Sequence, residues 1–572
     1  MSETERTVRA HEQTIQPLQR IVTVGCDGDY CPDLPALAAA ATLPSLGRPL
    51  AQWQSRRGGR CLATIEMGRV HPRSLFARFA FTRDELRSAS ARWTAARHQG
   101  PAAKPSEMRT YVHELTHYHQ LVTTPYGLFL QYCKKLQNEA TISLVNTLLA
   151  AGFPVIPPLL VNIIPLTSKM PTGVADEIRR CLSGWLNIEV LIAALDGNRA
   201  RRMDLSEMLI TFEKKAEKGA KPIIPPMLYW QRTFFLVQDS LADHITRVNH
   251  EARERRNPDP VYPGNIDRSA ITAALSALPS DFDRAIEGSE FGLSMLAGYR
   301  WDVDGIVESH ATAAEFWESD ATYDSFTAWA LANDDPDLGI YHNCLVLGLE
   351  AIGTRKLQSF LASYMALCEI ALFAPLLPWH AELRASSPSF DQLLPAVRFE
   401  RLLGSAAKIK PMQSPRDHGR FVLDLCKDLG WVHPTQIIRS AVDELQAVSD
   451  PITVVYLQAQ RWRAQMRSTT FIGIDPFLFD PSPAAEQWRY FFDFVIIDYK
   501  DRTTYHPDKN FLETMTTRYL SMLGLETLMR RDSLTLEAPY GKSTRESEWM
   551  TGLLRGRFRD LFGRDFPDLN VV

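Results

Sequence analysis

The residues of this sequence with the clearest chemical meaning are His113-Glu114-Leu115-Thr116-His117, an HExxH string. Successive residues of an α-helix lie about 100° apart around its axis, so His113 and His117 stand about 40° apart with Glu114 in the same arc. Imidazoles at positions i and i+4 suit a zinc ion, while the adjacent carboxylate takes a proton from the attacking water. The string therefore predicts a zinc hydrolase site with Glu114 as general base.

The residues around this string predict an amphipathic helix over Glu107 to Thr123. An apolar stripe beside the ligand face gives this helix a surface to bury, and its members are Met108, Val112, Leu115 and Val122. His119 points about 200° away from His117, so the two rings cannot share one ion. We therefore expect His119 at the surface or in contact with a ligand, and not on the metal.

A catalytic zinc site needs a third protein ligand and an open position for water. The continuation HExxHxxGxxH of the metzincins is absent, so this ligand must be distant. Residues Glu308 to Glu315 read Glu-Ser-His-Ala-Thr-Ala-Ala-Glu. Here the sequence resembles the gluzincins, the superfamily of thermolysin and the zinc aminopeptidases, whose third ligand is a glutamate on a later helix. The aminopeptidase helix reads Glu-Gly-Phe-Ala with a second Glu seven residues after the first, so the resemblance implies Glu308 as the ligand.

Helical geometry supports Glu308. Thr312 and Glu315 share its face, and Ala311, about 60° away, is small enough to let this helix approach the HExxH helix closely. Roughly 190 residues separate His117 from Glu308. The helices between them would therefore be an insertion relative to the gluzincins.

Two other residues are candidates for the third ligand. Glu139 follows His117 after 21 intervening residues, which is nearer the usual gluzincin spacing, but Ile142 stands where its helix would have to approach closely. His310 is on an apolar face, where a core histidine is the ordinary role; that face also holds Ile306, Ala314 and Trp317. Glu308 and Glu139 can also be read as exposed charges on helices.

The elements that must position these residues are mostly helices. The first hundred residues mix short β-like runs (Arg20 to Gly25, Cys61 to Met67, Ser74 to Phe81) with one helix, Arg83 to Arg97. After residue 106 helical periodicity dominates and strand-like alternation is rare. The further predicted helices are Tyr126 to Ala151, Val174 to Leu195, Pro226 to Arg255, Val303 to Ser319, Leu338 to Ile352, Thr354 to Phe373, Phe390 to Leu403, Arg416 to Asp428, Thr435 to Ala447, Ile452 to Arg467 and Asn510 to Met529.

We therefore predict a mostly α fold, a multi-helix metallopeptidase-like body with a small α+β N-terminal segment. A linker at Gln99 to Pro105 ends the first segment, because proline and glycine interrupt any helix there. The expected division is a 1–104 N-terminal segment, a 105–380 helical zinc-hydrolase core and a 381–572 C-terminal helical region.

Composition limits the classes of partner that we expect for this protein. The net charge is −4 and the basic residues are dispersed, so nucleic acid is not an expected partner. The polar N-terminus and the absence of an apolar run of spanning length predict a cytoplasmic protein without a membrane span. Eight scattered cysteines favour free thiols over disulfides, and the lone CxxxxC at Cys26 and Cys31 has no second pair to complete a zinc ribbon.

Two functions remain open. The first is a peptidase or related amide hydrolase with one Zn²⁺ and a peptide or protein substrate; Tyr341-His342 is then a candidate oxyanion donor. The second is a non-enzymatic helical interaction protein with a structural or vestigial metal site. A di-iron carboxylate protein would need Glu-x-x-His on two helices, and only Glu114 to His117 supplies it.

Overall fold

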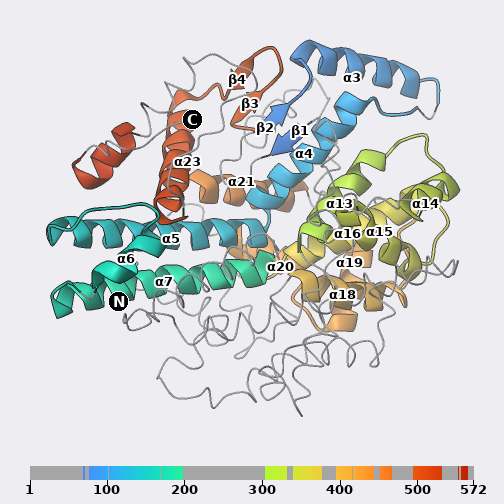
Figure 1. The fold of residues 1–572 in the computed structure, drawn as a ribbon. Coiled ribbons are helices and arrows are strands. Elements are labelled where there is room, and N and C mark those ends of the chain that lie inside the picture. The colour runs from blue at the N-terminus through green and yellow to red at the C-terminus, as the bar shows by residue number, and fades with distance from the viewer. Residues whose placement is uncertain are drawn as a thin grey trace, which may run out of the picture.

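The computed structural model of the chain is mostly helical in the part that it describes (Figure 1). It describes residues 68–70, 77–100, 102–167, 169–196, 303–331, 339–375, 395–414, 417–442, 451–466, 494–530, 552 and 555–564. The predicted helix Pro226 to Arg255, the β-like runs Arg20 to Gly25 and Cys61 to Met67, and the pair Cys26 and Cys31 lie outside these residues.

Every helix that we predicted within the described residues is present. The helices are α3 (Arg83–Arg97), α4 (Ser106–Thr123), α5 (Pro125–Ala150), α6 (Leu159–Thr167), α7 (Thr172–Asp196), α13 (Val303–Phe316), α14 (Tyr323–Leu331), α15 (Gly339–Ala351), α16 (Leu357–Leu372), α18 (Pro395–Ala406), α19 (His418–Leu429), α20 (Pro434–Val442), α21 (Pro451–Met466) and α23 (Lys509–Arg530). The sequence analysis missed α6 and α14, which have nine residues each and are too short to show a clear helical period.

Local chemistry explains where some of these helices begin and end. Thr82 and Glu85 form a capping box at the start of α3: the Glu85 amide donates to the Thr82 hydroxyl, and the Thr82 amide donates to the Glu85 carboxylate. Gly430 ends α19 in the left-handed conformation, which glycine adopts without a steric penalty. These signals lie within a few residues of each terminus and are readable from sequence.

Four short strands form one sheet in the order β1-β2-β3-β4. Strand β1 (Gly68–Val70) is antiparallel to β2 (Ala77–Phe79), which is parallel to β3 (Ile496–Asp498), and β3 is antiparallel to β4 (Thr503–Tyr505). The run expected at Ser74 to Phe81 contains β2, whereas β1, β3 and β4 were not predicted. The sheet therefore joins the N-terminal segment to the C-terminal region, across both expected boundaries.

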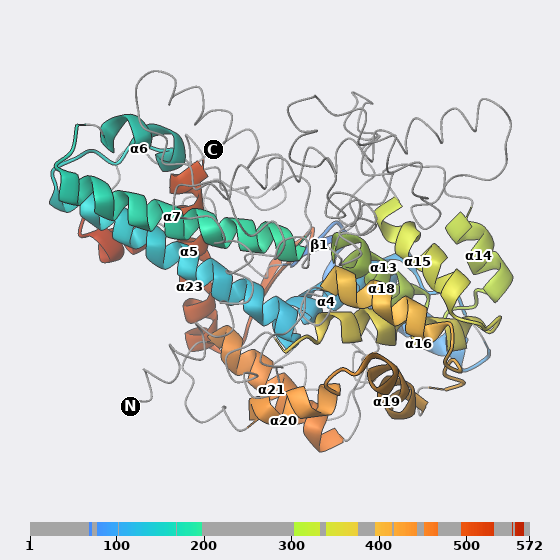
Figure 2. The same cartoon turned by 90° about the horizontal axis from the view of Figure 1, so that it is seen from below.

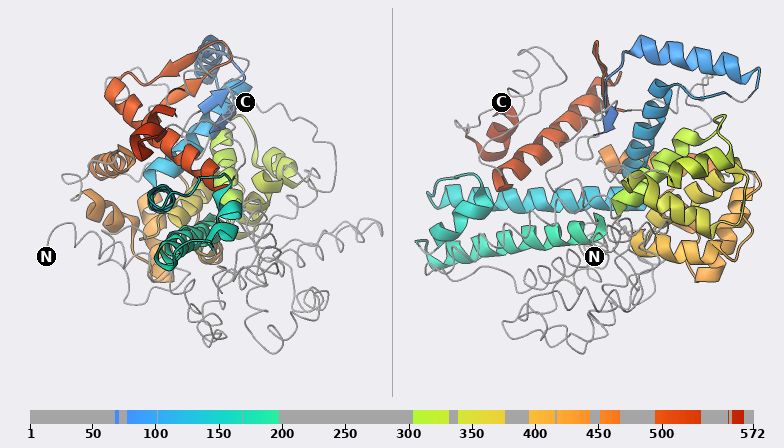
Figure 3. Two further views of the ribbon diagram at one scale, coloured as in Figure 1. Left: turned by 60° about the vertical axis from the view of Figure 1, so that its left-hand side comes forward. Right: turned by 45° about the vertical axis from the view of Figure 1, so that its right-hand side comes forward.

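Two large core clusters lie among the described residues, and α5 and α7 contribute to both. In Figures 2 and 3, α5 and α7 run side by side away from the rest, with α6 at their far end and α23 packed against α5. The smaller cluster includes Leu148 of α5, Ile178 of α7 and Leu525 of α23. A larger core joins the sheet, α4, α13, α16 and α21, and it buries the predicted apolar stripe of α4: Met108, Val112, Leu115 and Val122. No helix among the described residues is long and apolar enough to cross a membrane.

Helix α4 is held from several directions, since it packs against β1, α3, α5, α13 and α21. Its C-terminus is tied to α5 through Thr124, whose hydroxyl donates to the carbonyl of Gln120 (2.6 Å) and accepts from the amide of Gly127 (3.0 Å). A Cβ atom at position 127 would collide with the backbone carbonyls of Gln120 and Leu121. Only glycine allows α5 to start this close to the end of α4.

We expect Gly127→Ala to destabilise the protein by on the order of 1–3 kcal/mol, because the added methyl must push backbone rather than a flexible side chain. Gly184→Ala in α7 is the matched control, since a Cβ atom there meets no atom within 4 Å. That change removes a helical glycine and should be neutral or stabilising by up to about 1 kcal/mol. Urea unfolding monitored by circular dichroism measures both effects. Equal stability of the two variants would contradict the close approach of α5 to α4.

Candidate metal centre

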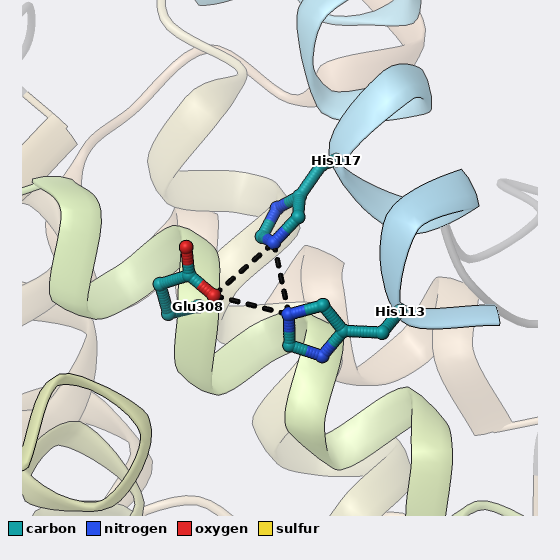
Figure 4. A group of neighbouring side chains, drawn as sticks. All are labelled: His113, His117 and Glu308. Carbon is teal, nitrogen blue, oxygen red and sulfur yellow. Dashed lines mark hydrogen bonds and ion pairs between the residues drawn. The ribbon is translucent and has the colours of Figure 1, made fainter. Parts of the chain in front are cut away.

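Three side chains from two helices converge between α4 and α13 (Figure 4). His113 and His117 come from α4 and Glu308 comes from α13. The two Nε2 atoms lie 3.0 Å apart, and Glu308 Oε2 lies 3.0 Å from His113 Nε2 and 3.1 Å from His117 Nε2. The three atoms thus form a nearly equilateral triangle, and the group could hold a metal ion.

Helix packing produces this convergence. The i and i+4 positions place both imidazoles on one side of α4, and α13 packs directly against that helix. Three alanines of α13 are fully buried, which allows a close approach: Ala311, Ala313 and Ala314. Lys104, in the segment before α4, donates to the carbonyl of Ala314 (3.3 Å) and so fastens the far end of α13.

The outer nitrogen of each imidazole faces an oxygen of another side chain. His113 Nδ1 donates to Glu315 Oε1 (2.7 Å), and His117 Nδ1 lies 3.0 Å from Gln120 Oε1. Because a carboxylate or amide oxygen can only accept, each Nδ1 carries a hydrogen. In neutral imidazoles the Nε2 lone pairs then point toward each other and toward Glu308.

Three lone pairs aimed at one another repel unless positive charge lies between them. Burial lowers the pKa of the His113 imidazole, but hydrogen bonds to Glu308 and Glu315 and the charges of both carboxylates outweigh burial and hold that pKa well above its usual value. Burial likewise lowers the pKa of His117, and the Glu308 carboxylate raises it by more. For Glu308, burial raises the pKa, yet the two histidines leave it far below the usual range of a carboxyl group. The cluster therefore attracts a cation.

The donor set and its spacing are compatible with a divalent metal ion such as zinc. Two ligands at about 2.0–2.1 Å from a tetrahedral zinc ion are about 3.4 Å apart, and the separations here are 3.0–3.1 Å. Two imidazole nitrogens and one carboxylate oxygen make a three-ligand set that leaves a fourth position for water. The side chains of His113, His117 and Glu308 keep 11%, 13% and 23% of their surface exposed, so solvent reaches the cluster.

Glu114 is adjacent to the cluster and is not one of its three members. The residue is 7% exposed, and its charge is among those that raise the pKa of His117. Its carboxylate is therefore close enough for its charge to act on the cluster.

The structure separates the remaining candidates from this centre. Glu139 is exposed on α5 and is not in the cluster. His310 is fully buried and accepts a hydrogen bond from Gln120 Nε2 (3.1 Å), as a core histidine should. Tyr341 and His342 belong to α15, but their side chains lie outside the described residues.

Of the two positions expected for His119, the surface position is wrong. The residue is 4% exposed, because α4 is covered by neighbouring elements on most of its sides. The prediction of free thiols is confirmed for the cysteines within the described residues. They are free and buried: Cys133, Cys181, Cys344, Cys368 and Cys426.

Sequence reasoning missed two partners of the histidines. Gln120 stands three residues after His117, about 60° around the helix and on the ligand face, a position that could have indicated its role. Glu315 was recognised as sharing the Glu308 face, but nothing in the sequence shows that its carboxylate meets His113. That contact depends on the packing of α13 against α4.

Comparisons of the chain with protein-family models, curated proteins and solved structures gave no match. The functional interpretation therefore depends on the geometry of the cluster and its surroundings.

The first prediction for this centre concerns its ligands. The purified protein should bind close to one equivalent of Zn²⁺, and His113→Ala, His117→Ala and Glu308→Gln should each weaken binding, because each change removes a ligand atom. Competition with a chromophoric chelator measures the affinity. Glu139→Gln is the matched control and should leave it unchanged. If Glu139→Gln releases the metal and Glu308→Gln does not, the ligand assignment is wrong.

The second prediction concerns Glu315, which orients His113. Glu315→Gln should lower zinc affinity by about 10–100-fold, the usual effect of removing a hydrogen-bonding partner of a metal-binding histidine. Glu318→Gln, three residues further along the chain, is the control: it removes an ion pair with Arg97 (2.8 Å), and both side chains of that pair are about 40% exposed. That control should bind zinc as the wild type does. Identical affinities for both variants would show that the Glu315 contact does not support the site.

Proposed function

We propose that this protein is a zinc-dependent peptidase or a related amide hydrolase, with zinc held by His113, His117 and Glu308. The observation that carries the proposal is the triangle of three ligand atoms 3.0–3.1 Å apart, with a buried glutamate beside it. A structural zinc site is normally closed by four protein ligands. Three candidate ligand side chains of the described residues converge here, and this proposal gives the fourth position to water.

Each side chain has a defined role in this proposal. When bound, zinc lowers the pKa of a coordinated water to about 7 and polarises a substrate carbonyl. Glu114 accepts the proton of the attacking water and returns it to the leaving amine. Glu315 keeps the His113 imidazole in the tautomer that presents Nε2 to the centre.

The gluzincin resemblance is consistent with this site. The offset of seven residues that suggested the resemblance places Glu308 and Glu315 on one face of α13. Glu308 meets both imidazoles from inside the cluster, and Glu315 meets His113 from outside. A metallopeptidase-like body is the fold that this resemblance implies, and a peptide or protein is the implied substrate.

Glu114→Gln tests catalysis apart from metal binding. Because Glu114 is not a ligand in this proposal, the amide should leave zinc content unchanged, while hydrolysis should fall by a factor on the order of 10² to 10⁴. Zinc is measured by elemental analysis, and hydrolysis with a mixture of internally quenched fluorogenic peptides. Glu107→Gln, in the first turn of the same helix, is the control and should retain full activity. Equal activity of Glu114→Gln and wild type contradicts the hydrolase proposal and favours a metal of structural role.

A further inference from the structure

Gln120 is a buried side chain, 2% exposed, whose amide group contacts three different partners. Its Oε1 atom lies 3.0 Å from His117 Nδ1. Its Nε2 atom donates to the carbonyl of Val307 (3.1 Å) and lies 3.1 Å from His310 Nδ1. An amide group has two donor hydrogens and one acceptor oxygen, and these contacts engage the oxygen and both hydrogens.

The orientation of this amide follows from its surroundings. A carbonyl oxygen only accepts, so the Gln120 atom that meets Val307 must be the nitrogen. The reversed amide would place two acceptor oxygens about 3 Å apart in a buried site, which costs about the free energy of an unsatisfied buried polar group. The same orientation gives His310 Nδ1 a donor. The amide oxygen is consequently fixed toward His117.

The fixed oxygen selects the tautomer of His117. It accepts only from Nδ1–H, so the neutral ring has its lone pair on Nε2, the atom that faces His113 and Glu308. With the other tautomer, Nδ1 and the Gln120 oxygen would be two acceptors 3.0 Å apart. One side chain thus prepares His117 as a ligand.

The same amide also fastens the helix that carries the third ligand. Val307 directly precedes Glu308 on α13, so the Gln120 hydrogen bond joins the two helices next to the ligand position. The hydrogen bond from Gln120 to the Val307 carbonyl therefore links α4 to α13 one residue before Glu308. A displaced Gln120 would therefore affect both His117 and the placement of the Glu308 carboxylate.

A neutral partner also limits the charge of the centre. Glu114, Glu308 and Glu315 already bring three carboxylates to it, while a zinc ion supplies two positive charges. The Nδ1 atom of His113 already has an anionic partner, Glu315. A carboxylate in place of the Gln120 amide at His117 Nδ1 would add another negative charge in a buried site. A glutamine provides the acceptor without this cost.

We propose that Gln120 is a positioning residue of the metal centre, which selects the Nδ1–H tautomer of His117 and sets the distance between α4 and the Glu308 position on α13. This inference rests on the proposed metal binding by His113, His117 and Glu308. It adds to that proposal a side chain that acts through another residue, His117, and through the backbone carbonyl of Val307.

The test compares three variants of the full-length protein. Gln120→Met removes the acceptor and both donors at similar volume, and Gln120→Glu keeps an acceptor for His117 but loses the donors to Val307 and His310. Gln460→Met is the matched control: Gln460 is also fully buried, and its amide nitrogen donates to the carbonyl of Thr123 (2.8 Å), at the end of α4. The measurements are Zn²⁺ affinity by chelator competition, the absorption spectrum of the Co²⁺-substituted protein, and the thermal unfolding midpoint.

Gln120→Met should lower Zn²⁺ affinity by about 10–100-fold and change the visible bands of bound Co²⁺, because the His117 ring loses its fixed orientation. Gln120→Glu should retain more affinity than Gln120→Met and a spectrum closer to that of the wild type. Gln460→Met should match the wild type in affinity and spectrum, even if its unfolding midpoint falls as far as that of Gln120→Met.

Three outcomes would overturn the inference. Wild-type affinity and spectrum in Gln120→Met would show that Gln120 does not position a ligand, while metal binding itself would stand. Equal losses in Gln120→Met and Gln460→Met would reduce the role of Gln120 to general support of α4. A wild-type protein that binds neither Zn²⁺ nor Co²⁺ at this centre would overturn the metal site and this inference together.

Discussion

The site depends on one electrostatic constraint: three lone-pair atoms are held 3.0–3.1 Å from one another at the contact between two helices. Such an arrangement is repulsive in itself, and the neighbouring carboxylates, which raise the pKa of His113 and His117, favour positive charge there. A protein that keeps this arrangement must stabilise it from outside. The hydrogen bonds of Glu315 and Gln120 to the outer ring nitrogens provide that support.

The rest of the fold serves to hold α4 and α13 at the required distance. Helix α4 is enclosed by β1, α3, α5 and α21 on the sides that α13 leaves free, and Gly127 allows α5 to begin directly at its end. Helix α13 approaches closely because its buried side chains are small, and Lys104 ties its C-terminal half to the segment before α4. The ligands therefore stand on rigid helices and not on loops.

The parts of the site that sequence could predict are those governed by periodicity within one helix. The HExxH spacing placed His113 and His117 on one side of α4, and the spacing of Glu308 and Glu315 placed them on one face of α13. Contacts between helices were not predictable: Gln120 was missed, and the surface was one of two positions expected for His119, although its neighbours bury it. The three-residue strands β3 and β4 were missed because so short a segment has no readable alternation.

The division of the ligands between two distant segments has a consequence for folding. His113 and His117 are local to one helix, whereas Glu308 joins them only after roughly 190 intervening residues have been placed. Closing so long a loop costs conformational entropy, which the packing of α13 on α4 must offset. An ion bound by all three side chains would act as a cross-link across that loop, so its binding free energy would stabilise the docked state of α13. Gln120 joins the same two helices without an ion, through its hydrogen bonds to Val307 and His310.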